Sequence, residues 1–375
     1  MEWEEITFDD LYRCAKCGLC LAQCPVYNQS LIEKDAPRGK IQLAKFFKDG
    51  RLELSERSRE LYSRCLLCGA CGAVCPSGMK ADQIVTRMRR EISAKKGLDR
   101  KTARVVSSVM ESHNISREDN EERTEALDDL LENTGDKGPA RVVYFVGCVS
   151  SFFPMVQRIA RNMVKIMEQA RVPFTVLGGE EWCCGFPLVG AGVPERIEEL
   201  ADHNVEAVKR SGAGRVVFSC PSCLRTWKAF YRTDLELMHT TEFILELIEA
   251  GALPLKALDP MKVTYHDPCD LGRHGGIYDP PRKILEAIPG LHLVEMEHRR
   301  ESSLCCGGGG NLEMVDPVLV GKLAGEKIRE IQKTGADAVV TACQQCVRTM
   351  TTRAKRQRID LPVMDITDLI LKAMK

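Results

Sequence analysis

The stretch Arg141-Val-Val-Tyr-Phe-Val-Gly-Cys148 decides the fold, because this β-branched and aromatic run ends in a cysteine and occurs again as Lys262-Val-Thr-Tyr-His-Asp-Pro-Cys269. After Cys148 come a gap of 34 residues, Cys183-Cys184-Gly185, and then Cys220-Pro-Ser-Cys223, with 35 residues between Cys184 and Cys220. After Cys269 come a gap of 35 residues, Cys305-Cys306-Gly307, and then Cys343-Gln-Gln-Cys346, with 36 residues between Cys306 and Cys343. Matching cysteines lie 121, 122 or 123 residues apart, so the chain contains a tandem duplication.

Each cysteine group follows a short apolar run that is typical of a buried strand. These runs are 142–146, 172–177 and 215–219 in the first copy, and 262–266, 291–296 and 337–341 in the second. Helical patterns with one apolar face lie between them, for example over 156–167 and 319–331. This alternation predicts parallel sheets, whose ligand sites lie beyond the carboxyl ends of the strands. We therefore expect the five cysteines of each copy to converge, and the two copies to face one shared cleft.

The other eight cysteines form the bacterial ferredoxin run twice near the N-terminus. In the two-cluster arrangement, the fourth cysteine of each run binds the other cluster. This predicts one [4Fe-4S] cubane on Cys14, Cys17, Cys20 and Cys75, and a second on Cys65, Cys68, Cys71 and Cys24. A pair of zinc knuckles is the alternative, but zinc sites favour two separated pairs of ligands over this dense spacing.

Composition narrows the possible classes of protein. The 375 residues carry 53 basic and 53 acidic side chains, which gives no electrostatic footprint for nucleic acid. The N-terminus does not resemble a signal peptide, and no apolar stretch approaches the roughly 20 residues of a membrane span. We expect a cytoplasmic protein that could sit at the membrane through a partner. All 18 cysteines belong to the motifs above, which favours metal binding over disulfides.

The expected fold class is α/β, with an α-helical two-cluster ferredoxin-like domain followed by two α/β cysteine-rich repeats with parallel sheets. The predicted boundaries are 1–93 for the ferredoxin-like domain, 94–140 for a charged linker, 141–258 for repeat 1 and 259–375 for repeat 2. The linker is expected to be solvated, with some helix and no chemical role.

Several other residues flank the cysteines. Gly185, Gly307 and Gly308 are candidate cofactor-binding residues, because glycine lets backbone N–H groups approach cluster sulfides closely. The alternatives for the glycines at 307–310 are a flexible turn or a phosphate-binding nest, and the second is disfavoured because the Lys-Ser/Thr of a P-loop is missing. His266 and His274 bracket Cys269 and could donate protons to leaving thiolates, although structural hydrogen bonding is the commoner role. Trp182 and His203 are expected to serve packing.

A ferredoxin-like N-terminus joined to two such repeats resembles the HdrD-type subunit of heterodisulfide reductase. It is also similar to the iron–sulfur subunits of glycolate, lactate and glycerol-3-phosphate oxidoreductases. The resemblance extends over essentially the whole chain, including Ala36-Pro-Arg-Gly-Lys40 and His266-Asp-Pro-Cys269. It implies that each complete repeat holds a non-cubane [4Fe-4S] cluster. The ligands would be Cys148, Cys183, Cys184, Cys220 and Cys223 in one repeat, and Cys269, Cys305, Cys306, Cys343 and Cys346 in the other.

The resemblance implies an oxidoreductase subunit that passes electrons from ferredoxin-type clusters to repeat-bound clusters that reduce a disulfide. A flavoprotein or a membrane cytochrome subunit would be its electron partner, and no flavin or NAD site is expected on this chain. An electron-transfer subunit of a flavoprotein hydroxy-acid dehydrogenase is the alternative. A zinc-stapled interaction module is a third hypothesis, which iron and sulfide analysis would test.

Overall fold

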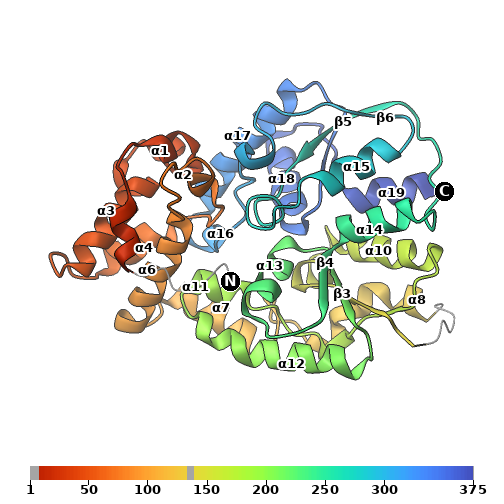
Figure 1. Ribbon diagram of the computed structural model, residues 1–375, viewed down its shortest axis with the longest axis horizontal. Coiled ribbons are helices and arrows are strands. Elements are labelled where there is room, and N and C mark those ends of the chain that lie inside the picture. The colour runs from red at the N-terminus through yellow and green to blue at the C-terminus, as the bar shows by residue number, and fades with distance from the viewer. Residues whose placement is uncertain (1–7, 133–138, 375) are drawn as a thin grey trace.

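The structure is a computed structural model that describes residues 8–132 and 139–374. The chain forms three lobes (Figure 1). A helical lobe at the N-terminus lies beside two α/β lobes, and the two α/β lobes pack against each other. The expected fold class is confirmed, because each α/β lobe is built on a parallel sheet.

The helical lobe contains short helices around the ferredoxin runs and two longer helices that support them. The helices are α1 (Leu19–Gln23), α2 (Pro25–Ser30), α3 (Pro37–Lys48), α4 (Glu56–Ser63), α5 (Ala70–Ala73) and α6 (Ala81–Lys96). Helices α3 and α6 share an apolar core in which Ile41, Ile84 and Met88 are buried. This core lies directly beneath the cysteine loops, so it fixes their position.

The segment expected to be a solvated linker is packed against repeat 1. It forms α7 (Arg100–Glu111), the 3-10 helix η3 (Asn120–Leu127) and α8 (Asp128–Leu131). Val106, Val109 and Leu127 are buried in the same core as the strands of repeat 1. Arg123 of η3 is 1% exposed and contacts the sulfur of Cys148, so the segment is packed and not solvated at this residue, and the absence of a chemical role stays a prediction. The charged stretch gave no indication that Arg123 is buried, because most of the neighbouring residues are exposed.

The two repeats have the same sheet topology. Repeat 1 contains β1 (Val142–Phe145), β2 (Phe174–Thr175), β3 (Arg215–Phe218) and β4 (Glu236–His239), and repeat 2 contains β5 (Met261–His266), β6 (Leu291–Leu293), β7 (Ala338–Thr341) and β8 (Val363–Asp365). The strand orders are β2-β1-β3-β4 and β6-β5-β7-β8, and every pairing is parallel. The fourth strand of each sheet was not expected, because these short runs lead straight into helices.

Helices cover both sheets. In repeat 1 they are α9 (Cys148–Phe152), α10 (Gln157–Gln169), α11 (Phe186–Ala191), α12 (Ile197–Arg210), α13 (Pro221–Phe230) and α14 (Thr240–Glu249). In repeat 2 they are α15 (Asp279–Ala287), α16 (Leu312–Val315), α17 (Pro317–Lys333), α18 (Gln344–Gln357) and α19 (Ile366–Met374). Among the described residues, none of the helices combines the length and apolar character that crossing a bilayer requires.

The two repeats pack with approximate two-fold symmetry. Helix α10 of repeat 1 contacts α19 of repeat 2, and α14 contacts α15 (Figure 1). Since α10 corresponds to α15 and α14 to α19 in the duplication, each repeat presents the same pair of helices to the other. This is the arrangement of an isologous interface. Arg158 and Asn162 of α10 bind the carboxylate of Asp368 on α19 and fix the register.

Candidate iron–sulfur sites

The two ferredoxin runs adopt the same backbone conformation. Lys16 and Leu67 precede the second cysteine of their runs, and both have positive φ, of 59° and 53°. Gly18 and Gly69 follow that cysteine with φ of 86° and 70°, and each caps the short helix after it. The two-residue spacing between successive cysteines therefore forms a tight loop, which directs the cysteine side chains toward one point.

The runs exchange their fourth cysteines around two hollows. One hollow is lined by Cys24, Cys65, Cys68 and Cys71. The other is lined by Cys14, Cys17, Cys20 and Cys75, with Cys71 at its edge. These are the two groups of thiols expected from the spacing. The cysteines are free thiols, so each group offers four sulfur donors, which suits a cubane cluster.

In each repeat the cysteines lie where the strand order reverses. Cys148 follows β1 and Cys220 follows β3, and these strands are neighbours although two crossovers separate them in sequence. Cys269 and Cys343 follow β5 and β7 in the same way. A parallel sheet opens a crevice at such a switch point, so both repeats carry their cysteines at the position where this fold binds ligands.

The five sulfurs of each repeat form a chain of contacts. In repeat 1 the order is Cys148, Cys183, Cys184, Cys223 and Cys220. In repeat 2 it is Cys269, Cys305, Cys306, Cys346 and Cys343, and the Sγ atoms of Cys306 and Cys346 are 3.3 Å apart. Nine of these ten cysteines are buried, and Cys269 is partly exposed. Five adjacent thiols exceed the four that a cubane or a tetrahedral zinc requires, and the set fits an iron–sulfur cluster with a spare ligand.

The two repeat sites face each other. The hydrogen bond with Cys346 is the largest single influence on the pKa of Cys343 and lowers it, but burial and then the charges of Cys220 and Cys306 raise that pKa overall, so Cys343 lies within electrostatic range of the repeat 1 site. Gln344, next to Cys343, donates from Nε2 to the carbonyl of Val146 in repeat 1 at 3.3 Å. The amide of Gln344 is fully buried between the repeats. The expected placement of the two sites on a shared face therefore agrees with the contacts.

The ferredoxin-like lobe contacts repeat 2 through a cysteine of each. A hydrogen bond between the thiols of Cys68 and Cys305 lowers the pKa of Cys68, and it outweighs the opposing effect of burial. The glycine run makes this approach possible, because a Cβ on Gly309 would lie 2.9 Å from the carbonyl oxygen of Leu66, and one on Gly310 would overlap that of Cys65. Gly309 and Gly310 of this run therefore pack directly against the ferredoxin-like lobe.

One arginine ties all three lobes together. Arg89 of α6 donates to the carbonyl oxygens of Gly190 in repeat 1 and Gly310 in repeat 2, each at 3.0 Å. It also donates to three carbonyls of its own lobe, those of Tyr62, Ser63 and Cys65. Its side chain is buried, and the dipoles of these five backbone carbonyls stabilise its charge.

The candidate glycines support the cysteine loops. Gly185 and Gly307 have φ of 88° and 93°, a region that favours glycine. A Cβ on Gly185 would lie 2.9 Å from Ile197, and one on Gly308 would lie 2.5 Å from Thr349. The backbone N–H of Gly307 donates to the Sγ of Cys305 at 3.5 Å. This amide-to-sulfur bond is the type expected at an iron–sulfur site, and cofactor binding by these glycines stays a prediction.

The candidate histidines lie at repeat 2. His266 is 1% exposed and lies within 4.8 Å of the sulfurs of Cys306 and Cys346, measured between ligand atoms. Burial lowers its pKa, so the ring is neutral at pH 7. His274 contacts the carbonyl of Leu67 at 3.0 Å and lies 3.9 Å from the carboxylates of Asp82 and Asp270. Neither position identifies a catalytic role, which stays a prediction, and Phe145 occupies the place of His266 in repeat 1.

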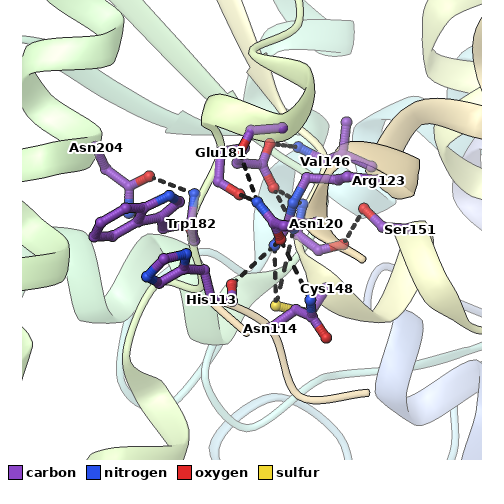
Figure 2. Close-up of polar contacts among 12 residues, drawn as sticks. His113, Asn114, Asn120, Arg123, Val146, Cys148, Ser151, Glu181, Trp182 and Asn204 are labelled. Carbon is purple, nitrogen blue, oxygen red and sulfur yellow. Dashed lines mark hydrogen bonds and ion pairs between the residues drawn. The ribbon is translucent and has the colours of Figure 1, made fainter. Parts of the chain in front are cut away.

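Residues that the sequence did not indicate surround Cys148 (Figure 2). Arg123 and Glu181 form a buried ion pair at 2.9 Å, and Arg123 also reaches the sulfur of Cys148. Trp182 is stacked between the rings of His113 and His203, with centroids 3.6 and 3.5 Å away. The packing role expected of Trp182 and His203 is thus a three-ring stack. The contact of Arg123 with Cys148 could not be predicted, because a single arginine within a charged segment forms no motif or periodic pattern.

Comparisons with known proteins agree with this architecture. The cysteine-rich domain family matches residues 142–228 and 263–351, and the 4Fe-4S dicluster domain family matches residues 10–79. The HdrD-type subunit of dihydromethanophenazine:CoB–CoM heterodisulfide reductase from Methanosarcina barkeri is 32% identical, over 97% of this chain and 94% of that protein.

Two relatives with lower sequence identity have other names. One of the subunits of the fumarate reductase (CoM/CoB) from Methanothermobacter marburgensis is 27% identical over 95% of this chain and 71% of that protein. The probable iron–sulfur-binding oxidoreductase FadF from Bacillus subtilis is 25% identical over 97% of this chain and 60% of that protein. With its dicluster domain, its two cysteine-rich repeats and a relative matched almost end to end, the chain belongs to the iron–sulfur oxidoreductase family of the HdrD-type heterodisulfide reductase subunits.

Proposed function

We propose that this chain is the iron–sulfur subunit that reduces a small-molecule disulfide, with the CoB–CoM heterodisulfide named for its Methanosarcina relatives as the first candidate. The observation that carries the proposal is the pair of five-thiol sites facing each other across the two repeats. Reduction of a disulfide consumes two electrons and two protons and releases two thiols. A matched pair of sites suits a substrate that has two sulfur atoms.

The proposed ligands are the 18 cysteines in four groups. The two ferredoxin groups would hold cubanes, and the two repeats would hold non-cubane clusters, for about 16 irons per chain. Such clusters supply one electron at a time and, with an open iron position, can accept a thiolate sulfur. The chain's own residues hold these sites apart from water, since most of the cysteine sulfurs of both repeats are buried.

The contacts support one route for the electrons. Cys17 is exposed in the first ferredoxin group, which is therefore the side open to a donor. Cys71 borders both ferredoxin hollows, and Cys68 of the second group touches Cys305 of repeat 2. From repeat 2 the path continues to repeat 1 through the proximity of Cys343 and Cys220. We propose a separate flavoprotein or membrane cytochrome subunit as the electron partner, in keeping with relatives that are named as subunits.

The test compares Cys184→Ala with Cys306→Ala. Each variant is assayed anaerobically with the CoB–CoM heterodisulfide and a reduced viologen donor, beside iron and acid-labile sulfide analysis. Both variants should lose disulfide turnover and retain reduction of the ferredoxin clusters, because each repeat handles one of the two sulfurs. Substantial disulfide turnover in either variant contradicts the paired-site function and supports a relay for a hydroxy-acid flavoprotein. Zinc in place of iron contradicts every redox function.

A further inference from the structure

Arg123 places a guanidinium group at the first cysteine of repeat 1. Its Nη1 and Nη2 atoms lie 3.9 and 3.8 Å from the Sγ of Cys148 (Figure 2). Nη1 also donates to the Oε1 of Glu181 at 2.9 Å, and Nη2 donates to the carbonyl of His113 at 3.1 Å. The side chain is 1% exposed, so the cation is held away from water.

Glu181 fixes this arginine to the cysteine loop. Its carboxylate accepts the backbone N–H groups of Val146 and Gly147, each at 2.8 Å, and these residues lead directly into Cys148. A buried cation is stable only when it is paired and hydrogen-bonded. The carboxylate therefore orients the guanidinium toward the sulfur while it offsets part of the positive charge.

Repeat 2 also has an arginine close to its first cysteine, Arg273, which lies four residues after Cys269. Its Nε donates to the carbonyl of Cys68 at 2.7 Å, and its Nη1 donates to the carbonyl of Ser303 at 2.7 Å. Burial alone would lower the pKa of Arg273, but the charges of Cys68, Cys269 and Cys305 raise it. Its hydrogen bonds to the described residues go to backbone carbonyls, whereas those of Arg123 include a carboxylate.

The two arginines come from positions that the duplication does not relate. Arg273 lies four residues after Cys269, and the residue four after Cys148 is Phe152. The guanidinium of Arg123 lies over the ring of Phe152, 5.3 Å from its centroid. Arg123 belongs to η3, which lies outside both repeats and outside the residues that the family models match. It provides a positive charge near Cys148, where the residue equivalent to Arg273 is the uncharged Phe152.

The partners correspond as well. Glu181 and Ser303 both lie two residues before the paired cysteines of their repeats. The side-chain carboxylate of Glu181 accepts a hydrogen bond from Arg123, and the backbone carbonyl of Ser303 accepts one from Arg273. Descent from one ancestral repeat would place the two arginines at the same position. Each repeat therefore has an arginine near its first cysteine, although the two arginines come from positions that the duplication does not relate.

We propose that Arg123 and Arg273 are positioning residues that set the reduction potentials of the clusters in repeat 1 and repeat 2. The inference rests on the proposed function, because it assumes iron–sulfur clusters in both repeats. One added electron increases the negative charge on the ligand sulfurs, and a nearby hydrogen-bonding cation stabilises that charge. The effect of Arg273 should be the larger of the two, because no carboxylate among its hydrogen-bond partners offsets it.

The test is an anaerobic redox titration of the full chain followed by electron paramagnetic resonance. Cys148→Ser and Cys269→Ser identify the signals of repeat 1 and repeat 2. Arg123→Gln should lower the equilibrium constant for one-electron reduction of the repeat 1 cluster about tenfold, which is a fall of about 59 mV in its reduction potential. The potential of the repeat 2 cluster should stay unchanged. Arg273→Gln should lower the potential of repeat 2 by more, and shift the cubane held by Cys68 in the same direction. Arg123→Lys and Arg273→Lys should recover most of each loss, because they keep the charge.

Two further variants separate charge from folding. Arg123→Gln combined with Glu181→Gln removes the pair together, so that no lone buried carboxylate remains. Arg215→Gln is the control, because this arginine binds the carboxylates of Glu236 and Glu246 at the amino end of β3, opposite the end that leads to Cys220, and it should move neither potential. Arg123→Phe combined with Phe152→Arg gives repeat 1 the arrangement of repeat 2 and should restore its potential.

The outcomes are distinct. Unchanged potentials in the arginine variants, with full iron content, overturn the inference and leave the proposed function standing. A swap that does not restore the potential after Arg123→Gln has lowered it overturns the equivalence of the two arginines. Absence of any repeat signal in the wild-type chain overturns the proposed function instead.

Discussion

Repeat 1 and repeat 2 share a topology and a cysteine pattern, yet they differ in what surrounds their sites. Repeat 2 receives the ferredoxin-like lobe, with Cys305 against Cys68 and the glycine run beneath Leu66. Repeat 1 receives the segment around η3, which supplies Arg123 and a stacking partner for Trp182. The two repeats therefore share their cysteine pattern but differ in the neighbours that the rest of the chain supplies, and in the proposed route repeat 2 receives electrons first.

The largest expected effect tests this difference directly. Cys305→Ala should abolish reduction of both repeat clusters through the ferredoxin-like lobe, because Cys305 is where that lobe touches repeat 2. Its counterpart Cys183→Ala should leave repeat 2 reducible at the wild-type rate. Rapid mixing with reduced viologen, followed by freeze-quench resonance spectra, measures both. Equal behaviour of the two variants would show that electrons enter each repeat independently.

A smaller effect is expected at Arg89, which donates a hydrogen bond to one backbone carbonyl in each repeat. Arg89→Met removes a buried cation from five carbonyl groups and should lower the free energy of unfolding by at least about 3 kcal/mol. The neighbouring Arg90→Met is the matched control. Its pairing with Glu195 is exposed and 3.7 Å long, so its loss should cost no more than about 1 kcal/mol. Urea unfolding of both variants checks the difference, and similar midpoints would contradict the role of Arg89 as a three-lobe junction.

The smallest effect compares the last helix of each repeat. His239 caps α14 and Asp365 caps α19, at equivalent positions. Burial lowers the pKa of His239 to about 3, and burial with the charge of Asp368 raises the pKa of Asp365 to about 7. The free energy of unfolding therefore falls as pH drops below about 6.5, because the unfolded chain binds a proton at His239 that the folded chain does not. It also falls as pH rises from about 4 through 7, because the folded chain keeps a proton on Asp365 that the unfolded chain loses.

The two caps therefore respond to pH in opposite directions. His239→Asn should flatten the acid side of the stability profile between pH 5 and 6.5. Asp365→Asn should remove a fall in stability between pH 5 and 7, of up to about 1.4 kcal/mol per pH unit. Urea midpoints measured from pH 5 to 8 give both slopes. Parallel slopes in the two variants would show that the caps do not titrate as their burial requires.

Much of the fold followed from local patterns. The six strands that precede or flank cysteines were predictable because buried parallel strands are short β-branched runs, and β1, β3, β5 and β7 lie within one residue of the expected bounds. β4 and β8 were missed because each run is only three or four residues long and leads directly into a helix. The grouping of Cys24 with Cys65 was predictable because the spacing is a property of the loop itself.

The surroundings of the sites could not be predicted in the same way. Arg123 reaches Cys148 across 25 residues, and Arg273 reaches Cys68 across 205. Such contacts depend on how lobes pack, and a single sequence carries no period or spacing that encodes them. The charge run 116–125 misled for a related reason, because one buried residue among exposed neighbours leaves the local composition unchanged.

The isologous packing of α10 on α19 and of α14 on α15 has a consequence for the origin of the chain. An interface of this kind needs only one surface, so a single repeat could form it with a second copy of itself. Such a homodimer would offer two identical docking surfaces, and a mutation in one would always change both. Joining the copies in one polypeptide ended that constraint. One half could then specialise in receiving a neighbouring domain, while the other enclosed its site with a segment that its twin never acquired.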